Sequence, residues 1–491
     1  MFPHHELNNF GAGGETIISP LVLVPMVIAC LLILLISRRY VIGAFLIPAI
    51  FIPMGQAVMV GGVHLRMTRI LVIVAVVRII VSRYLTHTEE PIEKSPLDRF
   101  FILWAVSYAV IFSLRWGTST AFFNQMGTLS DSLGIFFVLR FLIRDEEDIR
   151  RTIRVLAVIC GMVAACMLLE RQTGRNTLYF LGGVSEFSEV RHGHVRAQGP
   201  FGHSILAGSF AATLIPLFIA LWVYGGKQKI YAIFGILFSL TAVSVCGSST
   251  PVMAIAGGVA ALSIWPLRDK MWVVRRGIVA TVILLQIVMK SDVWWLIAHV
   301  DVAGGSTGWD RSALIDNAIH HFGEWWLLGT NNNINWGFDM FDLCVQYVAQ
   351  AVQGGLLTLV LFFALITVAF KLVGRARKAA AGAKPTEFFI WAIGAALFSH
   401  ICSFFGSSYW DQTEFAWFVM LAIICAVSHS AVTVEDRQES AVPISSARGF
   451  QTASAFHPAP PTPWVGLPKS KMAVQNLNSR KGSNFRLGHR S

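Results

Sequence analysis

Residues 291–341 read SDVWWLIAHVDVAGGSTGWDRSALIDNAIHHFGEWWLLGTNNNINWGFDMF, and this polar stretch interrupts a chain made mostly of apolar segments. It is rich in Asp, His, Asn and Trp, whereas the residues on either side form apolar runs of membrane-spanning length. Polar side chains in such numbers are costly inside the hydrocarbon of a bilayer. We therefore predict that this stretch lies outside the membrane and carries the chemistry of the protein.

The composition around this stretch is that of a multi-pass membrane protein. Of the 491 residues, 55% are hydrophobic and 14% are charged, and the mean hydropathy is +0.60. Runs of about 17–25 apolar residues can cross a bilayer, and we count about eleven to fourteen of them. We expect an all-α fold: a polytopic transmembrane helix bundle with a large, partly helical outer loop between late spans. The predicted spans are residues 17–37, 41–60, 68–82, 100–114, 121–143, 153–169, 204–224, 230–246, 251–267, 277–289, 344–372, 388–405 and 415–432.

Positive charge predicts the orientation of the bundle, because Lys and Arg are enriched in short cytoplasmic loops. Alternate loops carry nearly all of this charge, which predicts an outer N-terminus and a cytoplasmic C-terminus. The formal net charge of +11 then reflects topology and an anionic inner leaflet, not nucleic-acid binding. The basic clusters lie at residues 38–39, 83–99, 144–154, 227–229, 268–276 and 375–384.

The chain is predicted to comprise a membrane domain at residues 1–432 and a tail at residues 433–491. The membrane domain includes a first outer loop at residues 170–203 and the main outer loop at residues 291–341. The tail is rich in Pro, Ser, Asn, Arg and Lys, which cannot bury a core, so we expect it to be disordered in the cytoplasm. No cleavable signal peptide is expected, and the seven Cys are expected to be packing residues, not disulfides.

The first outer loop carries several Arg and His residues, against the positive-inside trend. Such cations indicate an anionic ligand, and the planar fork of Arg suits phosphate because it donates two hydrogen bonds at once. The candidates are Arg191, Arg196 and His203, and Arg196 is favoured because a Gly-Pro-Phe-Gly turn follows it just above a span. The alternative is a solvated loop with salt bridges to Glu186 and Glu189.

The main outer loop contains an amphipathic segment that begins at Asp310. One side of its helical wheel is polar and ends at His320 and Glu324, and the other side is apolar. With four Trp residues nearby, this pattern predicts a helix at the outer interface. Arg311 falls on the apolar side, at the depth of a lipid-linked pyrophosphate. The alternative is that Arg311 snorkels or pairs with Asp310.

The end of the main loop has the composition of a sugar-binding surface. Amides and carboxylates bond sugar hydroxyl groups, and an indole ring stacks on the apolar face of a pyranose. Trp325 and Asn332 belong to this part of the loop, and a short outer loop adds Trp410 and Asp411, which we expect to complete the wall of a cleft. The alternative is an ordinary interfacial turn.

Five segments between residues 195 and 370 occur in a recognisable order and spacing. Together they resemble the O-antigen ligase and polymerase superfamily of bacterial envelope glycosyltransferases. The segments are VRAQGPFGHSILAGSFAATLIPLFIAL (195–221), CGSSTP (246–251), WDRSALIDNAI (309–319), LGT (328–330) and GGLLTLVLFF (354–363).

The resemblance implies that a glycan is transferred from undecaprenyl pyrophosphate at the outer face of the bacterial inner membrane. It implies no cofactor and no metal, a periplasmic main loop and a loop arginine that Arg311 matches. The chain departs from the family at Ser249-Thr250, where many members have Ser-Arg. It departs again at Cys344-Val345, where many ligases have His-Asn.

The ending Asp-x-x-x-Gln-Tyr, with Gln346 and Tyr347, resembles exopolysaccharide polymerases more than lipid A-core ligases. We add both residues to the substrate-binding candidates.

The chemistry of these residues agrees with glycan transfer. Pyrophosphate is a good leaving group, so it needs charge stabilisation by Arg311 and Arg196 more than it needs a general acid. The attacking hydroxyl needs orientation and a base, and Asp342 is the favoured base because it lies where the main loop re-enters the membrane. The other candidates for this role are Asp316, His320, Asp310 and Glu324.

We therefore expect polymerisation or ligation of undecaprenyl-pyrophosphate-linked glycan units, by an exopolysaccharide or O-antigen polymerase in the first instance. The expected partners are an acceptor glycan or lipid, other polysaccharide assembly proteins and membrane lipid, and no nucleic acid. The main alternative is a transporter or flippase for lipid-linked sugar or polysaccharide, a class that often has internal repeats and broken helices near the bilayer midplane. A non-catalytic assembly subunit is a further alternative.

Overall fold

The structure is a computed structural model, and it describes residues 18–60, 63–85, 93–191, 193–299 and 308–441. The chain divides into two units, Met1–Ser440 and Ala441–Ser491, and the helices and cavities belong to the first unit. Helix α15 (Thr413–Ala441) continues through residues 433–441, where the sequence predicted the start of a disordered tail. The rest of that predicted tail lies outside the described residues.

The described residues are mainly helical, with two short antiparallel hairpins formed by β1 (Ala57–Val60) and β2 (Val63–Arg66) and by β3 (Glu189–Arg191) and β4 (His194–Arg196). The α-helices of the bundle are α1 (Pro20–Leu35), α2 (Arg38–Phe51), α3 (Met67–Ile80), α4 (Pro96–Trp116), α5 (Ser119–Leu142), α6 (Glu146–Thr173), α7 (Ser204–Trp222), α8 (Gly226–Cys246), α9 (Ser249–Ser263), α10 (Met271–Val288), α13 (Gln346–Ala379), α14 (Lys384–Ser403) and α15. The loops contain η1 (Val81–Leu85), η2 (Tyr179–Leu181), η3 (Trp265–Lys270), η4 (Val293–His299), α11 (Gly308–His320), α12 (Phe322–Trp325) and η5 (Asn333–Trp336).

The fold confirms the all-α helix bundle predicted from the sequence. Each predicted apolar span overlaps one helix of the described residues. Seven helical segments are long and apolar enough to cross a membrane, and α1, α9 and residues 413–429 form shorter apolar helices. The helices therefore fit a multi-pass membrane protein. The second predicted span, residues 41–60, is too long: its helix ends at Phe51, and the β1–β2 hairpin follows.

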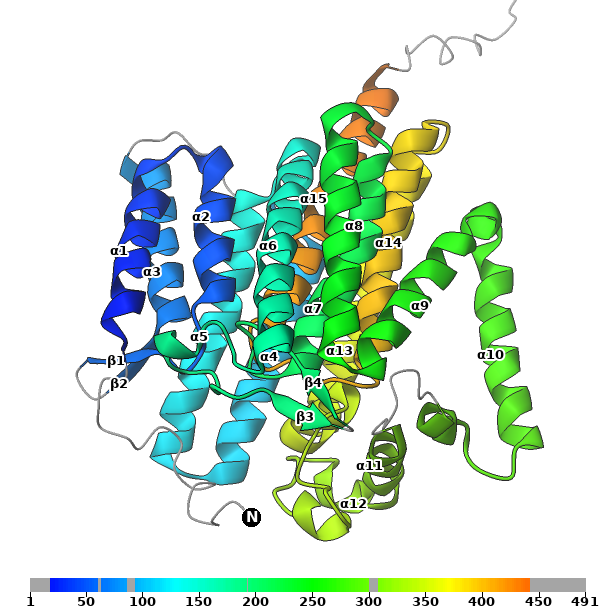
Figure 1. The fold of residues 1–491 in the computed structure, drawn as a ribbon. Helices are drawn as coiled ribbons and strands as arrows, with labels where there is room; N and C mark the ends of the chain where they lie inside the picture. Colours follow the sequence, from blue (N-terminus) through cyan, green and yellow to red (C-terminus); the bar gives the residue numbers. More distant parts are fainter. Residues whose placement is uncertain (1–17, 61–62, 86–92, 192, 300–307, 442–491) are drawn as a thin grey trace, which may run out of the picture. The chain divides into compact units, whose positions relative to one another are not determined.

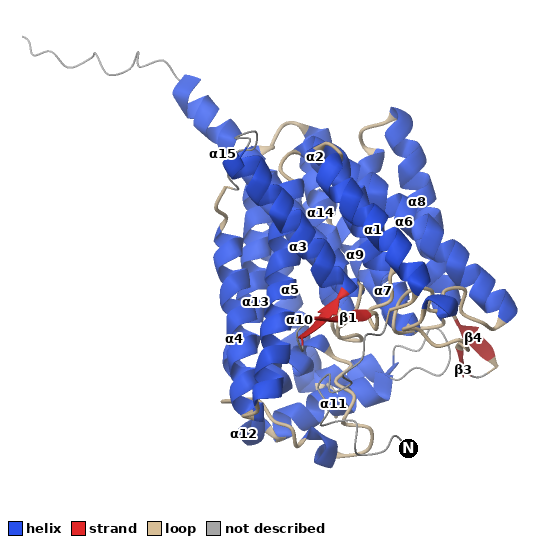
Figure 2. Ribbon diagram, turned by 90° about the vertical axis from the view of Figure 1, so that its left-hand side faces the viewer, coloured by secondary structure: helices blue, strands red, loops and turns tan. Residues whose placement is uncertain are grey.

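The long helices run side by side, and successive connections alternate between the two ends of the bundle (Figures 1 and 2). Both β hairpins, α11 and α12 lie at one end, the lower end in Figure 1. The connections rich in Lys and Arg lie at the opposite end. The segments predicted to be outer thus share one end, which brings the first and main outer loops together.

Helix α7 is the centre of the bundle and packs against α6, α8, α9 and α14. Nearly all of its residues are buried, many of them Ala, Gly or Ser, which allow close approach between helices. A Cβ added at Gly208 would lie 2.6 Å from Cys246 Sγ and from Pro251 Cγ. The start of α7 therefore lies against the α8–α9 turn, and this contact positions the loop before it.

Helix α13 differs from the single span predicted at residues 344–372, because it reverses direction at Gly354-Gly355. Tyr347 stacks on Phe363 with ring centroids 5.3 Å apart, although these residues would be about 24 Å apart along a straight helix. Gly355 has φ 67°, and a Cβ there would lie 2.6 Å from the Leu327 carbonyl oxygen. Residues 346–363 thus form a helical hairpin, so the first turns of α13 fold back into the bundle.

The main outer loop supports the turn of this helical hairpin. Backbone N–H groups of Thr330 and Leu356 donate to the carbonyls of Val352 and Trp326, respectively. The Arg115 guanidinium at the end of α4 also donates to the Val352 carbonyl, at 2.6 Å. These bonds satisfy backbone groups that the helix break leaves unpaired, as a buried break requires.

Candidate functional site

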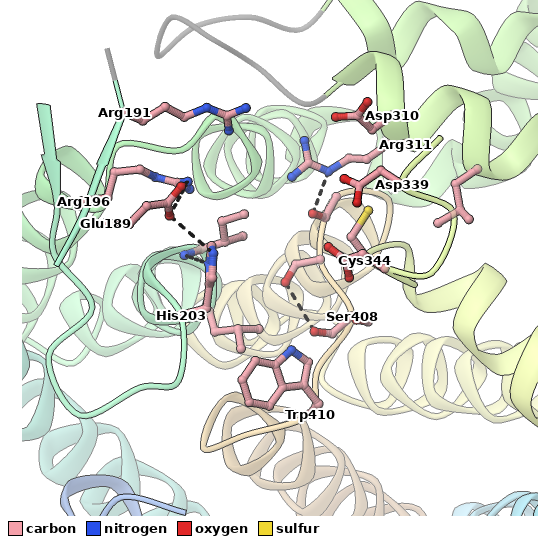
Figure 3. A pocket seen from close by; sticks show the side chains of 16 residues that line it. Glu189, Arg191, Arg196, His203, Asp310, Arg311, Asp339, Cys344, Ser408 and Trp410 are labelled. Atoms are coloured by element: carbon pink, nitrogen blue, oxygen red, sulfur yellow. Dashed lines mark hydrogen bonds and ion pairs between the residues drawn. The ribbon is translucent and has the colours of Figure 1, made fainter. Parts of the chain in front are cut away.

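The two long outer loops and the loop before α15 meet around a cavity of about 380 Å³, which we call the arginine pocket (Figure 3). Residues that are far apart in the sequence line it, because the connections of three helix pairs converge at this end of the bundle. Its polar lining residues are Glu189, Arg191, Arg196, His203, Asp310, Arg311, Asp339, Asp342, Cys344, Ser407, Ser408 and Trp410.

Arg196 reaches the pocket from the end of β4 and is buried. Its Nη1 donates to both carboxylate oxygens of Glu189, at 3.0 and 2.8 Å, and its Nε donates to the Cys246 carbonyl at 3.4 Å. The β3–β4 register places Glu189 directly opposite Arg196. The salt bridge that the sequence left as an alternative is therefore present, and Arg196 lines the pocket at the same time.

Arg311 enters from the opposite wall, from the first turns of α11, and is also buried. Its Nε donates to the Gly406 carbonyl at 2.8 Å, which fixes the side chain and leaves the terminal nitrogens directed into the pocket (Figure 3). Arg191 points towards it from the β3 side. Arg191 has no carboxylate partner among the described residues, so these two guanidinium groups face the same space.

Four carboxylates balance the three guanidinium groups of the pocket. Glu189 pairs with Arg196, whereas Asp310 and Asp339 lie on the α11 side with Arg311 (Figure 3). Asp342 lines the same pocket and interacts electrostatically with these three residues. The pocket therefore does not attract anions through an excess of positive charge. It can hold an anion only where the guanidinium groups face each other, and it offers carboxylate oxygens beside that position.

Burial and neighbouring charges shift the pKa values of Asp342 and His203 in opposite directions. Removal from bulk water raises the pKa of Asp342, and the negative charge of Asp339 raises it further, while Arg311 opposes both effects. Burial lowers the pKa of His203, and the nearby charge of Arg196 adds to this effect. His203 Nδ1 accepts the Ile205 N–H at 3.2 Å, so this ring caps α7 and is held largely neutral.

A second cavity of about 450 Å³ adjoins the arginine pocket, and we call it the glutamine cavity. The helical hairpin of α13 forms one side of it, and α4 and α5 form the other. It shares Asp342, Ser408 and Trp410 with the arginine pocket. Its other polar or aromatic lining residues include Arg66, Trp104, Tyr108, Gln125, Asp131, Gln346, Gln350, Gln353, Tyr409 and Glu414.

Hydrogen bonds fix several amides of the glutamine cavity. Trp104 Nε1 donates to Gln350 Oε1 at 2.8 Å, and the Tyr108 hydroxyl donates to Gln353 Oε1 at 2.5 Å. The Tyr409 N–H donates to Gln346 Oε1 at 2.8 Å. In each amide the oxygen is bound, so the NH₂ group remains to donate to another acceptor. The cavity therefore presents oriented donors beside aromatic rings.

Two of the four candidate catalytic residues line these cavities, namely Arg311 and Asp342. Asp316 and His320 do not. Asp316 accepts a hydrogen bond from Trp294 Nε1 at 3.2 Å, and the exposed His320 ring lies 3.5 Å from the same carboxylate. Asp316 belongs to the packing of α11 against η4, whereas His320 is exposed, and helical spacing places both on the face that turns away from Arg311.

The predicted sugar-binding residues of the main loop stabilise the loop itself. Glu324 accepts hydrogen bonds from Trp336, His321 and Asn332, and these bonds lower its pKa. Trp325 is buried, and its Nε1 donates to the Ala318 carbonyl at 2.6 Å. Among the described residues these groups bond one another, so neither cavity includes Glu324, Trp325 or Asn332.

Each of the remaining candidates either lines a cavity or supports the segments around it. Arg191, Arg196, His203 and Asp310 line the arginine pocket, Gln346 lines the glutamine cavity, and Trp410 lines both. Asp411 is buried and accepts from the N–H groups of Gly202 and Thr413, both at 2.9 Å. The Tyr347 hydroxyl donates to the Ile401 carbonyl at 3.1 Å. Asp411 and Tyr347 thus hold the loop before α15 and the helical hairpin in place.

Glu189 and Asp339 were not identified from the sequence as pocket residues, and Glu189 was considered only as a salt-bridge partner. Of the amides of the glutamine cavity, Gln346 was identified from the sequence, but Gln125, Gln350 and Gln353 were not. The Gln residues at positions 346, 350 and 353 recur at helical spacing, which places them on one face of a helix. The prediction of a single span at residues 344–372 did not take this spacing into account.

Thr250 and Cys344, two positions considered in the sequence analysis, lie beside Arg311. The Thr250 hydroxyl donates to the Gly406 carbonyl that Arg311 also contacts, at 3.2 Å. Cys344 lines the arginine pocket, and burial raises its pKa to about 12. Its thiol therefore stays protonated at neutral pH and is unsuited to accept a proton.

No protein-family model matches this chain, and a search of curated proteins finds no match either. Among the described residues, no group of three or more His, Cys, Asp or Glu side chains is placed to hold a metal ion. The function must therefore be argued from the two adjoining cavities.

Proposed function

We propose that the protein is a membrane glycosyltransferase that joins lipid-pyrophosphate-linked glycan units at the outer face of the bacterial inner membrane. The observation that carries this proposal is that two cavities adjoin at Asp342, Ser408 and Trp410. Guanidinium groups line one cavity, and amides and aromatic rings line the other. Such a pair suits a reaction between a pyrophosphate-linked donor and a hydroxyl-rich acceptor.

The arginine pocket is the proposed site of the donor pyrophosphate. Arg191 and Arg311 face each other across it, so a phosphate between them accepts hydrogen bonds from both sides (Figure 3). Arg196 lines the same pocket, paired with Glu189. Fixed cations are most useful where negative charge develops in the transition state, which here is the departing pyrophosphate oxygen. This arrangement needs no metal ion to neutralise the leaving group.

The glutamine cavity is the proposed site of the acceptor sugar, with Asp342 as general base at its boundary. The acceptor hydroxyl oxygen forms a bond to the anomeric carbon of the donor sugar as the bond from that carbon to the pyrophosphate oxygen breaks. The hydroxyl proton passes to the Asp342 carboxylate, and the lipid pyrophosphate leaves with the bonding electron pair. Trp410 borders both cavities, where an indole ring can stack on either sugar.

The resemblance favours an exopolysaccharide or O-antigen polymerase over a ligase, with undecaprenyl pyrophosphate as the donor carrier. In this proposal both outer loops are periplasmic, the tail is cytoplasmic and the acceptor is a second glycan chain or a lipid. Other polysaccharide assembly proteins are its expected partners.

The experiment is to measure cell-surface polysaccharide in a deletion strain that carries wild type, Arg311→Ala or Arg175→Ala at matched membrane levels. Arg175 is an exposed outer-loop arginine, paired with Glu186 at 3.4 Å, that lines neither cavity. We expect Arg311→Ala to abolish long polymer while single repeat units are still made, and Arg175→Ala to leave polymer unchanged. Normal polymer from Arg311→Ala would remove the arginine pocket from the mechanism.

A transporter of lipid-linked sugar is the second candidate, and the broken helix α13 is the observation that favours it. Discontinuous helices are common at the substrate sites of transporters. The two functions differ in where unpolymerised units accumulate. If the protein is a polymerase, its deletion leaves unpolymerised units at the outer face, where a membrane-impermeant sugar probe labels them in intact cells. No labelling above wild type in the deletion strain would instead favour transport.

A further inference from the structure

Helix α10 stands apart from the other helices, on the right in Figure 1, and its first turns lie at the end opposite the arginine pocket. No residue of α10 is buried, although it is long and apolar enough to cross a membrane. Between α10 and helices α9, α13 and α14 lies a crevice of about 500 Å³, which we call the basic crevice. Its walls are mainly apolar, with Ile278, Phe370 and Phe398 among them.

The charges of the basic crevice are strongly unbalanced. Its lining contains six Lys or Arg residues and one Asp. Arg268 and Arg377 are neutralised, because both bond Glu387 Oε1, at 3.0 and 2.7 Å, and Arg377 also bonds Asp269 at 3.0 Å. The other four cations have no carboxylate partner among the described residues: Arg275, Lys371, Arg375 and Lys378.

These four cations come from two helices that do not pack on each other. Arg275 belongs to the first turns of α10, and the other three belong to the last turns of α13. Their mutual repulsion opposes a closer approach of these two helix ends, and an anion between them would offset it. An anion here also needs an apolar part, because the crevice continues as an apolar slot between the helices.

We propose that the basic crevice binds one anionic phospholipid, with its phosphate-containing headgroup among the four cations and an acyl chain along the apolar walls. Each Lys or Arg close to anionic lipid contributes to binding, so four cations around one headgroup select it over a zwitterionic lipid. The bound lipid bridges α10 and α13 and neutralises their repulsion. This proposal does not depend on the transfer reaction.

The test is native mass spectrometry of the purified full chain after incubation with equimolar phosphatidylglycerol and phosphatidylcholine. The wild type is expected to retain one phosphatidylglycerol in preference to phosphatidylcholine. Replacing the four unpaired cations with Gln is expected to reduce that preference at least about tenfold. The matched control replaces four exposed cations outside the basic crevice with Gln: Arg39, Lys227, Lys229 and Lys384.

The control decides between a site and a general surface attraction. The site is supported if the control variant retains phosphatidylglycerol and the crevice variant loses it. Equal retention of the two lipids by the wild type overturns it, and so does an equal loss in the two variants, because a charged surface would explain either result.

A second variant keeps the proposal testable if the fourfold change prevents folding. Gly374 lines the basic crevice, and a Cβ added there meets open space. Gly374→Leu is therefore compatible with the helix, retains all charges and fills the apolar slot. The control is Gly277→Leu, on α10 but outside the lining, where the space is also open. Loss of phosphatidylglycerol in Gly374→Leu alone supports the site, and retention by both variants overturns it.

Discussion

The arginine pocket and the basic crevice lie at opposite ends of the bundle and use the same kind of side chain differently. In the pocket, Arg196 and Arg311 are buried, fixed by hydrogen bonds and accompanied by four carboxylates. In the crevice, Arg375 and three other cations are exposed and lack carboxylate partners among the described residues. What a cluster of cations can do therefore depends less on how many cations it contains than on the groups that they bond. The pocket holds the guanidinium groups of Arg196 and Arg311 in fixed positions, whereas the four cations of the crevice are held by no carboxylate among the described residues.

The largest expected effect concerns the base in the arginine pocket. Asp342→Asn removes the proton acceptor but keeps the size of the side chain, and we expect glycan transfer to fall about 10²- to 10⁴-fold. The measurement is transfer to an acceptor glycan in membranes with equal protein levels. Asp316→Asn is the control, because Asp316 lines neither cavity and Asn still accepts from Trp294. Full activity of Asp342→Asn would assign the base to another group.

The exchange of Arg for Lys separates geometry from charge. Arg311→Lys keeps the charge but loses both the Nε bond to Gly406 and the planar fork, so we expect about a 10- to 100-fold loss of transfer. Arg375→Lys should change phosphatidylglycerol retention by less than about twofold, because exposed cations act mainly as point charges. Equal sensitivity at the two sites would contradict the comparison.

Salt should affect the two regions unequally. Raising NaCl from about 0.05 to 0.5 M shortens the Debye length and should weaken lipid retention at the exposed basic crevice several-fold. Binding of a short-chain lipid pyrophosphate in the arginine pocket should change less, because Arg196 and Arg311 are buried and shielded from ions. Both affinities can be measured on one purified sample. The comparison breaks down if the pocket proves the more salt-sensitive of the two.

The smallest effect is a shift of the pH profile. Only the ionised form of Asp342 accepts a proton, and its pKa is raised. As the pH is lowered, transfer should therefore begin to fall at a pH above the usual carboxyl range. Asp339→Asn removes one cause of this rise and should move the acidic limb to lower pH, with little change at the plateau. Asn tolerates the left-handed backbone at Asp339, where φ is 60°. An unmoved limb would show that a different group controls it.

Much of the candidate site was predictable from sequence, but the contacts that define it were not. Arg191, Arg196, His203, Arg311 and Asp342 were identified from charge and position, and all of them line the arginine pocket. The same reasoning could not tell that Asp316, Glu324 and Trp325 support the main loop. Residue type indicates which side chains can bind a sugar or a phosphate. Only their neighbours decide whether those groups are already occupied.

The sequence by itself determined the helical membrane fold, most helix positions and the separation of basic loops from the two long polar loops. These are local properties, because a span depends on the solvation of its own residues. Only the tertiary structure decided that α13 reverses at Gly354-Gly355, because the contacts of this turn are with the distant residues 326–330 of the main outer loop. It alone brought Arg191, Arg311 and Trp410 to one cavity. Such convergence depends on how helices from distant parts of the chain pack, which no single segment encodes.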